Sequence, residues 1–206
     1  WCGAGGHGCV VTARGGRPEV PAAGHPSLAP FLFPRCCRDR SAYVRVLAML
    51  HAYPPAHNAG AEWAAHGLLR ALVARGHEVD VLLSRRDAGS ERYELDGVQV
   101  WPYRGKADPG PWLGGERRAQ VIVTHLETTA RASILGQIHR IPVVHLLHNT
   151  FPKSKEWLVK GTPSLAVYNT EWMRADAEAW WRAHRGDRPM PPGLVVHPPV
   201  AVEDYQ

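Results

Sequence analysis

The amino-acid sequence predicts an α/β domain with a Rossmann-like, doubly wound parallel sheet, and two observations predict it. From Tyr43 onward, short apolar runs alternate with stretches whose apolar residues recur at helical spacing. The apolar runs are nearly continuous, which is typical of parallel strands that are covered on both faces. Strands that alternate with helices form parallel sheets with right-handed crossovers, so a doubly wound sheet is expected.

The expected elements begin after an irregular leader. Residues 1–42 are rich in glycine and proline and show no apolar period, so we expect them to be disordered or non-native, ahead of a Rossmann-like domain over 43–202. The strands are expected at 44–50, 78–83, 93–103 as a hairpin, 121–125, 143–147, 165–168 and 194–196. The helices are expected around 65–73, 130–138 and 173–181.

Individual residues justify the ends of these elements. Gly76 stands where a glycine commonly ends a helix, after the first helical stretch. Asp96 and Gly97 form a turn signal inside the hairpin. Pro142 is tolerated because it precedes the strand 143–147, where a missing N–H donor is harmless. Asn169 or Thr170 is suited to cap the last helix.

The strand order predicts where a ligand binds. In a doubly wound sheet the ligand lies at the carboxyl ends of the strands, where the strand order reverses. The loop 51–62 should therefore face the strand end at His125 and Glu127. Gly60 opens a helix there, and the free N–H groups of a helix start attract an anion such as phosphate. Relief of backbone strain is an equal explanation for this glycine.

Composition and missing motifs exclude several classes. The 206 residues carry a net charge of +5 with scattered basic residues, so no nucleic-acid partner is expected. No apolar run approaches the about 20 residues of a membrane-spanning helix, and no secretory signal is present, so we expect a cytoplasmic protein, at most peripheral to a membrane. The loop 51–62 lacks GxGxxG, which disfavours a nicotinamide cofactor although Arg85 and Arg86 follow the second strand. The cysteines and His7 of the leader lack a CxxC pair and are a poor set of zinc ligands.

A series of motifs in order resembles a known family. The motifs are the Tyr-Pro-Pro run at 53–55, Gly-Ala-Glu at 60–62, Arg-Gly-His-Glu-Val at 75–79, and the segments 96–100, 121–125, 142–149, 168–172 and 196–200. Together they resemble the N-terminal domain of GT-B glycosyltransferases of family 4, over about residues 44–202. Residues 203–206 then resemble the start of the interdomain linker, so we expect a truncated enzyme.

The resemblance implies a retaining glycosyltransferase of the hexosyltransferase type, which moves a sugar from a nucleotide-sugar donor to an acceptor. No metal or other cofactor is expected. The domain would be the acceptor-side half of the GT-B fold, and the missing second domain would hold the nucleotide, so the chain alone is expected to be inactive. The acceptor is left open among a sugar, a lipid-linked molecule and a protein. A non-catalytic sugar- or nucleotide-binding module and a sugar-nucleotide epimerase remain alternatives.

The resemblance also assigns roles to particular residues. His125 matches the family's active-site histidine, and an ordinary pKa near neutrality would let it act neutral or charged. Its alternative role is a hydrogen bond to the loop backbone. The residues expected at the donor phosphates or sugar are Gly60, Ala61 and Glu127, although Glu127 could simply favour the helix dipole. The residues expected at the acceptor or the cleft are His148, Asn149 and Asn169, although helix capping would also explain Asn169.

Other polar residues are given structural roles. Glu62, His66 and Arg70 lie one turn apart on the first helix and predict a solvated face. His145 lies within a strand and is expected to be structural.

Three lysines with a tryptophan form a further feature. Lys153, Lys155, Lys160 and Trp157 follow the fifth strand and predict an exposed helix with ordinary lysines. The less favoured interpretation is a surface for a phosphorylated or lipid-linked acceptor, or for a membrane.

Overall fold

The computed structural model describes residues 43–84, 91–102 and 108–198. Its strands are β1 (Arg45–Leu50), β2 (Glu78–Leu83), β3 (Tyr93–Leu95), β4 (Val98–Trp101), β5 (Val121–His125), β6 (Val143–Leu147), β7 (Leu165–Tyr168) and β8 (Gly193–Val195). Its helices are α1 (Gly60–Ala74), α2 (Gly110–Leu113), the 3-10 helix η2 (Gly115–Arg117), α3 (Thr128–His139), α4 (Pro152–Gly161) and α5 (Glu171–Arg185). The expected leader at 1–42 lies outside the described residues.

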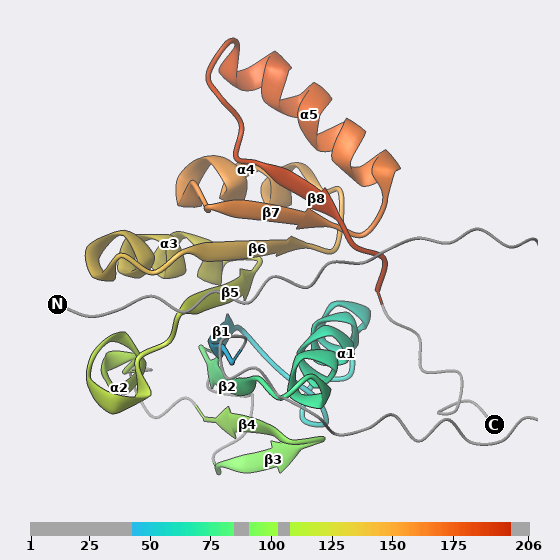
Figure 1. The fold of residues 1–206 in the computed structure, drawn as a ribbon. Coiled ribbons are helices and arrows are strands. Elements are labelled where there is room, and N and C mark those ends of the chain that lie inside the picture. The colour runs from blue at the N-terminus through green and yellow to red at the C-terminus, as the bar shows by residue number, and fades with distance from the viewer. Residues whose placement is uncertain (1–42, 85–90, 103–107, 199–206) are drawn as a thin grey trace, which may run out of the picture. The chain divides into compact units, whose positions relative to one another are not determined.

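The described strands form one twisted sheet in the order β3-β4-β2-β1-β5-β6-β7-β8 (Figure 1). Every neighbouring pair is parallel except the hairpin of β3 and β4. The chain moves outward from β1 to one side through β2 and β4, then returns to β5 and moves to the other side. This topology confirms the expected Rossmann-like, doubly wound α/β fold.

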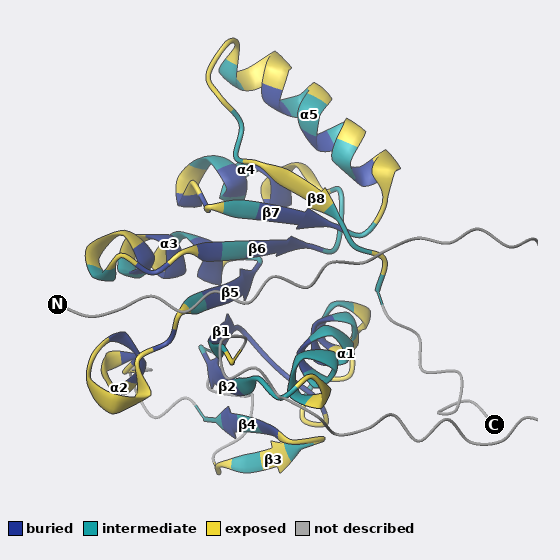
Figure 2. Ribbon diagram, viewed as in Figure 1, coloured by how far each residue is buried: buried dark blue, intermediate teal, exposed yellow. Residues whose placement is uncertain are grey.

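The central strands are buried on both faces, as their continuous apolar sequence predicts (Figure 2). On one face Val46, Ala48 and Leu50 of β1 belong to a core that includes Ala65 and Leu69 of α1. On the other face the intervening residues of β1 join a core made with α2, β5 and α3. The helices therefore cover both faces, because successive side chains of a strand point to opposite sides.

The element ends follow the local sequence. Gly76 has a φ of 89° and its N–H donates to the carbonyl of Val73 at 2.8 Å, which ends α1 as expected. The turn of the hairpin holds Gly97 at a φ of 79°. The cap of α5 is Thr170, whose hydroxyl oxygen accepts from the N–H of Met173 at 3.1 Å. Helix capping therefore does not explain Asn169.

The buried face of α3 differs from its apolar pattern. Ile134 and Ile138 are 56% and 68% exposed, while small residues face the protein. A Cβ atom on Gly136 would lie 2.4 Å from the side chain of Val143, so only small residues allow α3 to approach the sheet this closely.

The lysine-bearing segment forms α4, and it is less exposed than expected. Lys155 is buried and forms an ion pair with Asp176 of α5, so this lysine joins two helices. Lys160 pairs with Glu156 on the exposed side of α4. The expectation of ordinary exposed lysines is therefore wrong for Lys155. None of the helices in the described part of the chain is both long and apolar enough to span a membrane.

Candidate functional site

The structure brings the loop after β1 against the end of β5, where the strand order reverses. His51 directly follows β1, and His125 is the last residue of β5. The Nδ1 atom of His51 lies 3.0 Å from the Nε2 atom of His125. The hydroxyl of Thr128 lies 2.6 Å from the carbonyl oxygen of His125 and 2.9 Å from that of Met49, which holds the ends of β5 and β1 together.

The start of α1 lies beside this contact and has no side-chain cap. The helix begins at Gly60 after the N-cap residue Ala59, whose side chain makes no capping hydrogen bond. Gly60 is exposed, its φ is not in the left-handed region, and a Cβ atom there would meet nothing within 4 Å. Backbone strain and close packing therefore do not explain this glycine. The first N–H groups of α1 remain available to a ligand.

Glu62 connects the first turn of α1 to the two histidines. Its side chain is 2% exposed, and its Oε1 atom lies 2.9 Å from the Nε2 atom of His51. The Nδ1 atom of the half-buried His57 lies 3.5 Å from the same oxygen. Glu62, His51 and His125 thus form a continuous polar chain from α1 to β5.

The expectation of a solvated face on α1 is wrong for two of its three residues. Glu62 and His66 are both buried. The Nδ1 atom of His66 lies 2.8 Å from the hydroxyl of Tyr53, and its Nε2 atom lies 3.0 Å from a carboxylate oxygen of Asp96. The loop after β1 and the hairpin turn cover this side of α1 and supply the polar partners that water would otherwise supply.

His125 is neutral in the folded chain. It is fully buried, and burial together with the nearby His148, His51 and His145 lowers its pKa well below the usual value. Burial therefore favours the neutral form of His125, whereas an ordinary pKa near neutrality was expected from the sequence. A neutral imidazole ring donates one hydrogen bond and accepts another.

His145 on β6 and His148, directly after β6, also have low pKa values. Burial and the neighbouring His148 lower the pKa of His145 to about 3. Its Nδ1 atom contacts the hydroxyl of Thr129 on α3, which fits the expected structural role. Burial lowers the pKa of His148 to about 4, and its ring lies 5.5 Å from that of His125, nearly perpendicular to it.

Several polar atoms of the site lack partners within the described part of the chain. They are the Nδ1 atom of His125 and both ring nitrogens of His148, all shielded from solvent. Buried polar groups are nearly always hydrogen-bonded, so a group of unpaired ones calls for an explanation. A ligand that presents hydroxyl groups would satisfy them.

The remaining predicted residues lie around this group. His148 and Asn169 line a cavity of about 20 Å³ beside Ala64 and Leu68 of α1, with room for about one water molecule. Ala61 is half-buried in the first turn of α1. The side-chain oxygen of Asn149 accepts from the hydroxyl of Ser154 at the start of α4.

Glu127 stands apart from the histidine contacts. It is exposed at the start of α3 and makes no side-chain cap. The structure thus brings together His125, His148 and the start of α1. Glu127 lies on the surface, although it is only two residues from His125 in the sequence.

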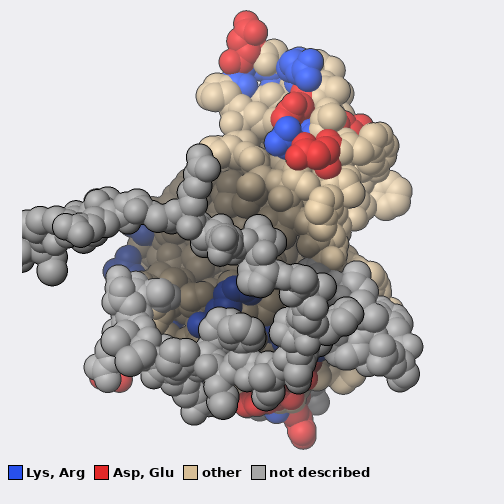
Figure 3. All heavy atoms as spheres, turned by 45° about the vertical axis from the view of Figure 1, so that its right-hand side comes forward, with Lys and Arg blue, Asp and Glu red and all other residues tan. Residues whose placement is uncertain are grey.

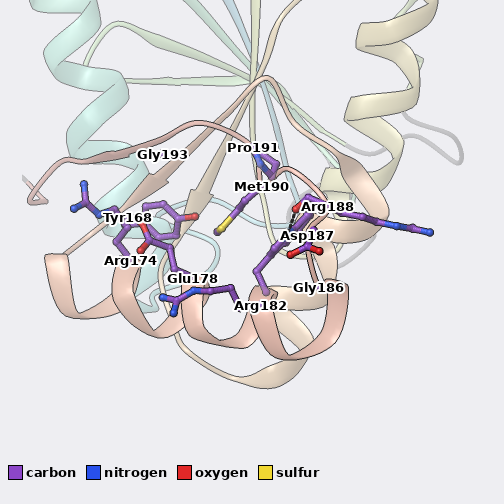
Figure 4. Close-up of a pocket in the computed structure, with 11 residues that line it drawn as sticks. Tyr168, Arg174, Glu178, Arg182, Gly186, Asp187, Arg188, Met190, Pro191 and Gly193 are labelled. Atoms are coloured by element: carbon purple, nitrogen blue, oxygen red, sulfur yellow. Dashed lines mark hydrogen bonds and ion pairs between the residues drawn. The ribbon is translucent and has the colours of Figure 1, made fainter.

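A larger cavity lies elsewhere. It measures about 470 Å³ and lies between α5 and the segment that leads to β8, with Tyr168, Arg174 and Met190 among its lining residues (Figure 4). None of the residues predicted for the site lines it. On the adjoining surface of α5 basic and acidic side chains are mixed, with Arg174 paired to Glu171 and near Glu178 (Figure 3).

His51 and His57 were not predicted as site residues from the sequence. Both lie in the loop that follows β1, at the ligand-binding edge of the sheet. The signal was their position, since side chains just beyond the carboxyl ends of central strands line the crevice of this fold. Glu62 was recognised as part of a helix-start motif, but it was expected on the solvated face of the helix and is buried instead.

The model of Glycosyltransferase Family 4 matches residues 58–188, which is more than half of the chain and includes both α1 and the end of β5. The chain belongs to glycosyltransferase family 4. This finding confirms the resemblance that the motifs carried. His51 and His57 lie before the matched region, next to its first residues.

A solved structure supports the fold of this family 4 glycosyltransferase domain. The crystal structure of Alr3699/HepE from Anabaena in complex with UDP matches with a TM-score of 0.51 and 14% sequence identity. The match covers 79% of this chain and 46% of HepE, so the chain spans about half the length of that protein. No curated protein matches the sequence.

Proposed function

We propose that this chain is the acceptor-side half of a retaining, hexosyltransferase-type GT-B enzyme that moves a sugar from a nucleotide sugar to an acceptor. One observation carries the proposal: the unpaired Nδ1 atom of His125 and the uncapped start of α1 are linked through His51 and Glu62. The family 4 match supports the transferase class. The UDP bound to HepE supports a nucleotide-linked donor.

The hydrogen-bond chain assigns a role to each nitrogen. The carboxylate of Glu62 can only accept, so the Nε2–H group of His51 donates to it. A neutral His51 then offers a lone pair on Nδ1, which accepts from the Nε2–H group of His125. A neutral imidazole carries one proton, so the Nδ1 atom of His125 is an acceptor. We propose that it accepts a hydrogen bond from a hydroxyl of the donor sugar.

The start of α1 is suited to the leaving group. Sugar transfer leaves a nucleoside diphosphate, whose negative charge grows as the glycosidic bond breaks. Three N–H groups at a helix start, together with the helix dipole, stabilise such a charge. Because these donors are already oriented, they stabilise the transition state without reorganisation. Gly60 leaves room for the phosphate, and Ala61 supplies the next N–H group.

His148 and its surroundings are proposed as the acceptor side. Both ring nitrogens of His148 are unpaired within the described residues, so one can donate to a hydroxyl of the acceptor and the other can accept from a different polar group. Asn169 lines the same small cavity. Asn149 is proposed to contact the acceptor, and the exposed Glu127 is proposed to contact the donor.

A transfer assay tests the proposal. The chain, alone and mixed with a polypeptide that carries a family 4 donor domain, is incubated with radiolabelled nucleotide sugars and with sugar, lipid-linked and protein acceptors. We expect transfer with the anomeric configuration of the donor kept, read from the anomeric NMR signal of the product. His125→Ala should lower kcat by about 10²–10³, and the exposed His184→Ala should not.

The alternatives give different results. Epimerised nucleotide sugar in the absence of any acceptor would show an epimerase. Saturable binding of a nucleotide sugar without transfer under every condition would show a binding module. Either result would overturn the proposed transfer.

A further inference from the structure

Three metal-ligating side chains meet next to His125. They are His51 from the end of β1, His57 from the following loop and Glu62 from α1, and each offers a ligand atom within 4.8 Å of the other two. The Nε2 atom of His51 lies 2.9 Å, and the Nδ1 atom of His57 lies 3.5 Å, from the same oxygen of Glu62. Ligand atoms about 2.0–2.2 Å from a tetrahedral zinc ion lie about 3.3–3.6 Å apart, so small movements suffice.

The cluster contains two buried polar atoms without a partner in the described residues. The side chain of Glu62 is only 2% exposed, and its Oε2 atom has no hydrogen-bond partner in the described ranges. The Nδ1 atom of His57 likewise has no hydrogen bond there. A buried carboxylate oxygen without a partner is costly, and a cation would satisfy it. These unpaired atoms point to a ligand independently of the spacing.

We propose that His51, His57 and Glu62 form a binding site for a first-row divalent transition metal, with Zn²⁺ as its representative. Two imidazoles and one carboxylate form a set that suits zinc and its neighbours. Mg²⁺ and Ca²⁺ prefer oxygen ligands throughout and fit poorly. The side chain of His57 is 39% exposed, so the ion enters from this side and keeps an open coordination position for water. This proposal differs from the expectation, drawn from the sequence, that no metal is bound.

Metal binding has a defined effect on His125. A metal on Nε2 of His51 requires the lone pair there, so the single proton of His51 moves to Nδ1. That N–H group then donates to Nε2 of His125, which must carry its own proton on Nδ1 instead. The pair gains and loses no proton overall. The metal thus converts the open nitrogen of His125 from an acceptor into a donor.

The effect on catalysis rests on the proposed function, whereas the metal site itself does not. If His125 accepts from a donor hydroxyl, zinc should inhibit sugar transfer in wild type. It should inhibit far less in His57→Ala, because this variant lacks one of the proposed metal ligands. The hydrogen-bond chain from Glu62 to His125 does not include His57 and is kept in the variant. Zinc binding in a protein without transferase activity would remove the proposed function and leave the site.

Calorimetric titration of the full chain with Zn²⁺, and visible absorption with Co²⁺, test the site. Both use a background in which the four cysteines of the leader are changed to Ser, so that thiolates do not contribute. We expect one ion per chain, and a cobalt spectrum typical of nitrogen and oxygen ligands. His57→Ala should weaken binding at least about tenfold, since even loss of an outer-shell partner weakens metal binding by 10–100-fold.

Two more variants and an NMR measurement complete the test of the metal site. The exposed His184→Ala is the matched control and should bind as wild type does, and Glu62→Gln should bind as weakly as His57→Ala. In NMR spectra that resolve the imidazole nitrogens, Zn²⁺ should move the proton of His125 from Nε2 to Nδ1. Equal affinity of wild type and His57→Ala, or no binding at all in folded protein, would overturn the proposal.

Discussion

The Nε2 atom of His125 lies 3.0 Å from the Nδ1 atom of His51, although 74 residues separate them in sequence. Because His51 also reaches Glu62, this contact fixes the ring of His125 relative to the start of α1. The two parts that the proposed reaction needs, an acceptor for a sugar hydroxyl and donors for a diphosphate, are therefore held by one hydrogen-bond chain.

Glu62→Gln should lower kcat of sugar transfer by roughly ten- to a hundredfold, with little change in the KM of the donor. The substitution keeps the shape of the side chain, but an amide no longer requires His51 to donate from Nε2. His125 then loses its fixed proton position. Steady-state kinetics of the variant and of the control His184→Gln check this. An unchanged kcat in a folded variant would show that Glu62 does not position His125.

Gly60→Ala should separate folding from binding. The backbone at Gly60 accepts a side chain and the Cβ atom meets open space, so the variant should be more stable by about 0.4–1 kcal/mol, because its unfolded chain is less flexible. The same methyl group enters the space proposed for a phosphate and should raise the KM of the donor. Urea unfolding and donor titration measure the two effects. A more stable variant with unchanged KM would argue against a phosphate at this position.

The fold could be predicted from the sequence because each strand and helix carries a local pattern. The apolar run of β1, the glycine after α1 and the turn of the hairpin all specify structure within a few residues. The orientation of α3 could not be predicted this way. Its isoleucines predict an apolar face, but the sheet accepts only the small residues around Gly136, and that constraint comes from distant parts of the chain.

The site was predictable in position and less so in chemistry. His125 and the start of α1 follow from the strand order, since ligands bind where that order reverses. The roles of Glu62 and His66 did not follow, because polar residues one turn apart on a helix are typical of a solvated face. Only the folded structure shows that a loop and a turn cover them. The low pKa of His125 also depends on burial, which the sequence does not state.

Stability should fall as the pH is lowered from about 6.5 towards 4. His145 has a pKa of about 3 in the folded chain, below the usual 6.5, so the unfolded chain binds more protons in this range. Such a group destabilises the fold by about 1.4 kcal/mol per pH unit as the pH falls. His145→Gln should remove this part of the slope, and the exposed His184→Gln should not. Urea unfolding at pH 7, 6 and 5 provides the comparison, and equal slopes would contradict it.

Lys155→Ala should destabilise the domain by about 1–3 kcal/mol. The lysine is buried and its ion pair joins α4 to α5, so its removal leaves Asp176 without the partner. Lys160→Ala is the matched control, because its pair with Glu156 is exposed and should contribute less than about 1 kcal/mol. Thermal or urea unfolding of both variants measures the difference. Equal effects would show that the buried pair does not hold the two helices together.

The proton on His125 is a separate prediction. In metal-free protein at pH 7 it should be on Nε2, because the proposed hydrogen-bond chain from Glu62 makes the nearby Nδ1 atom of His51 an acceptor and the lowered pKa disfavours the charged ring. Long-range ¹H–¹⁵N correlation spectra distinguish the two neutral forms from the charged one. A proton on Nδ1, or on both nitrogens, would contradict the assignment.

The most direct test of the account is an NMR titration of the ¹⁵N-labelled chain with UDP and with UDP- and GDP-sugars. We expect the amide signals of Gly60 and Ala61 and the Nδ1 signal of His125 to shift together, with one dissociation constant for a given ligand. Signals that shift only elsewhere in the domain, or a response of the helix start without a response of His125 to any nucleotide sugar, would contradict it.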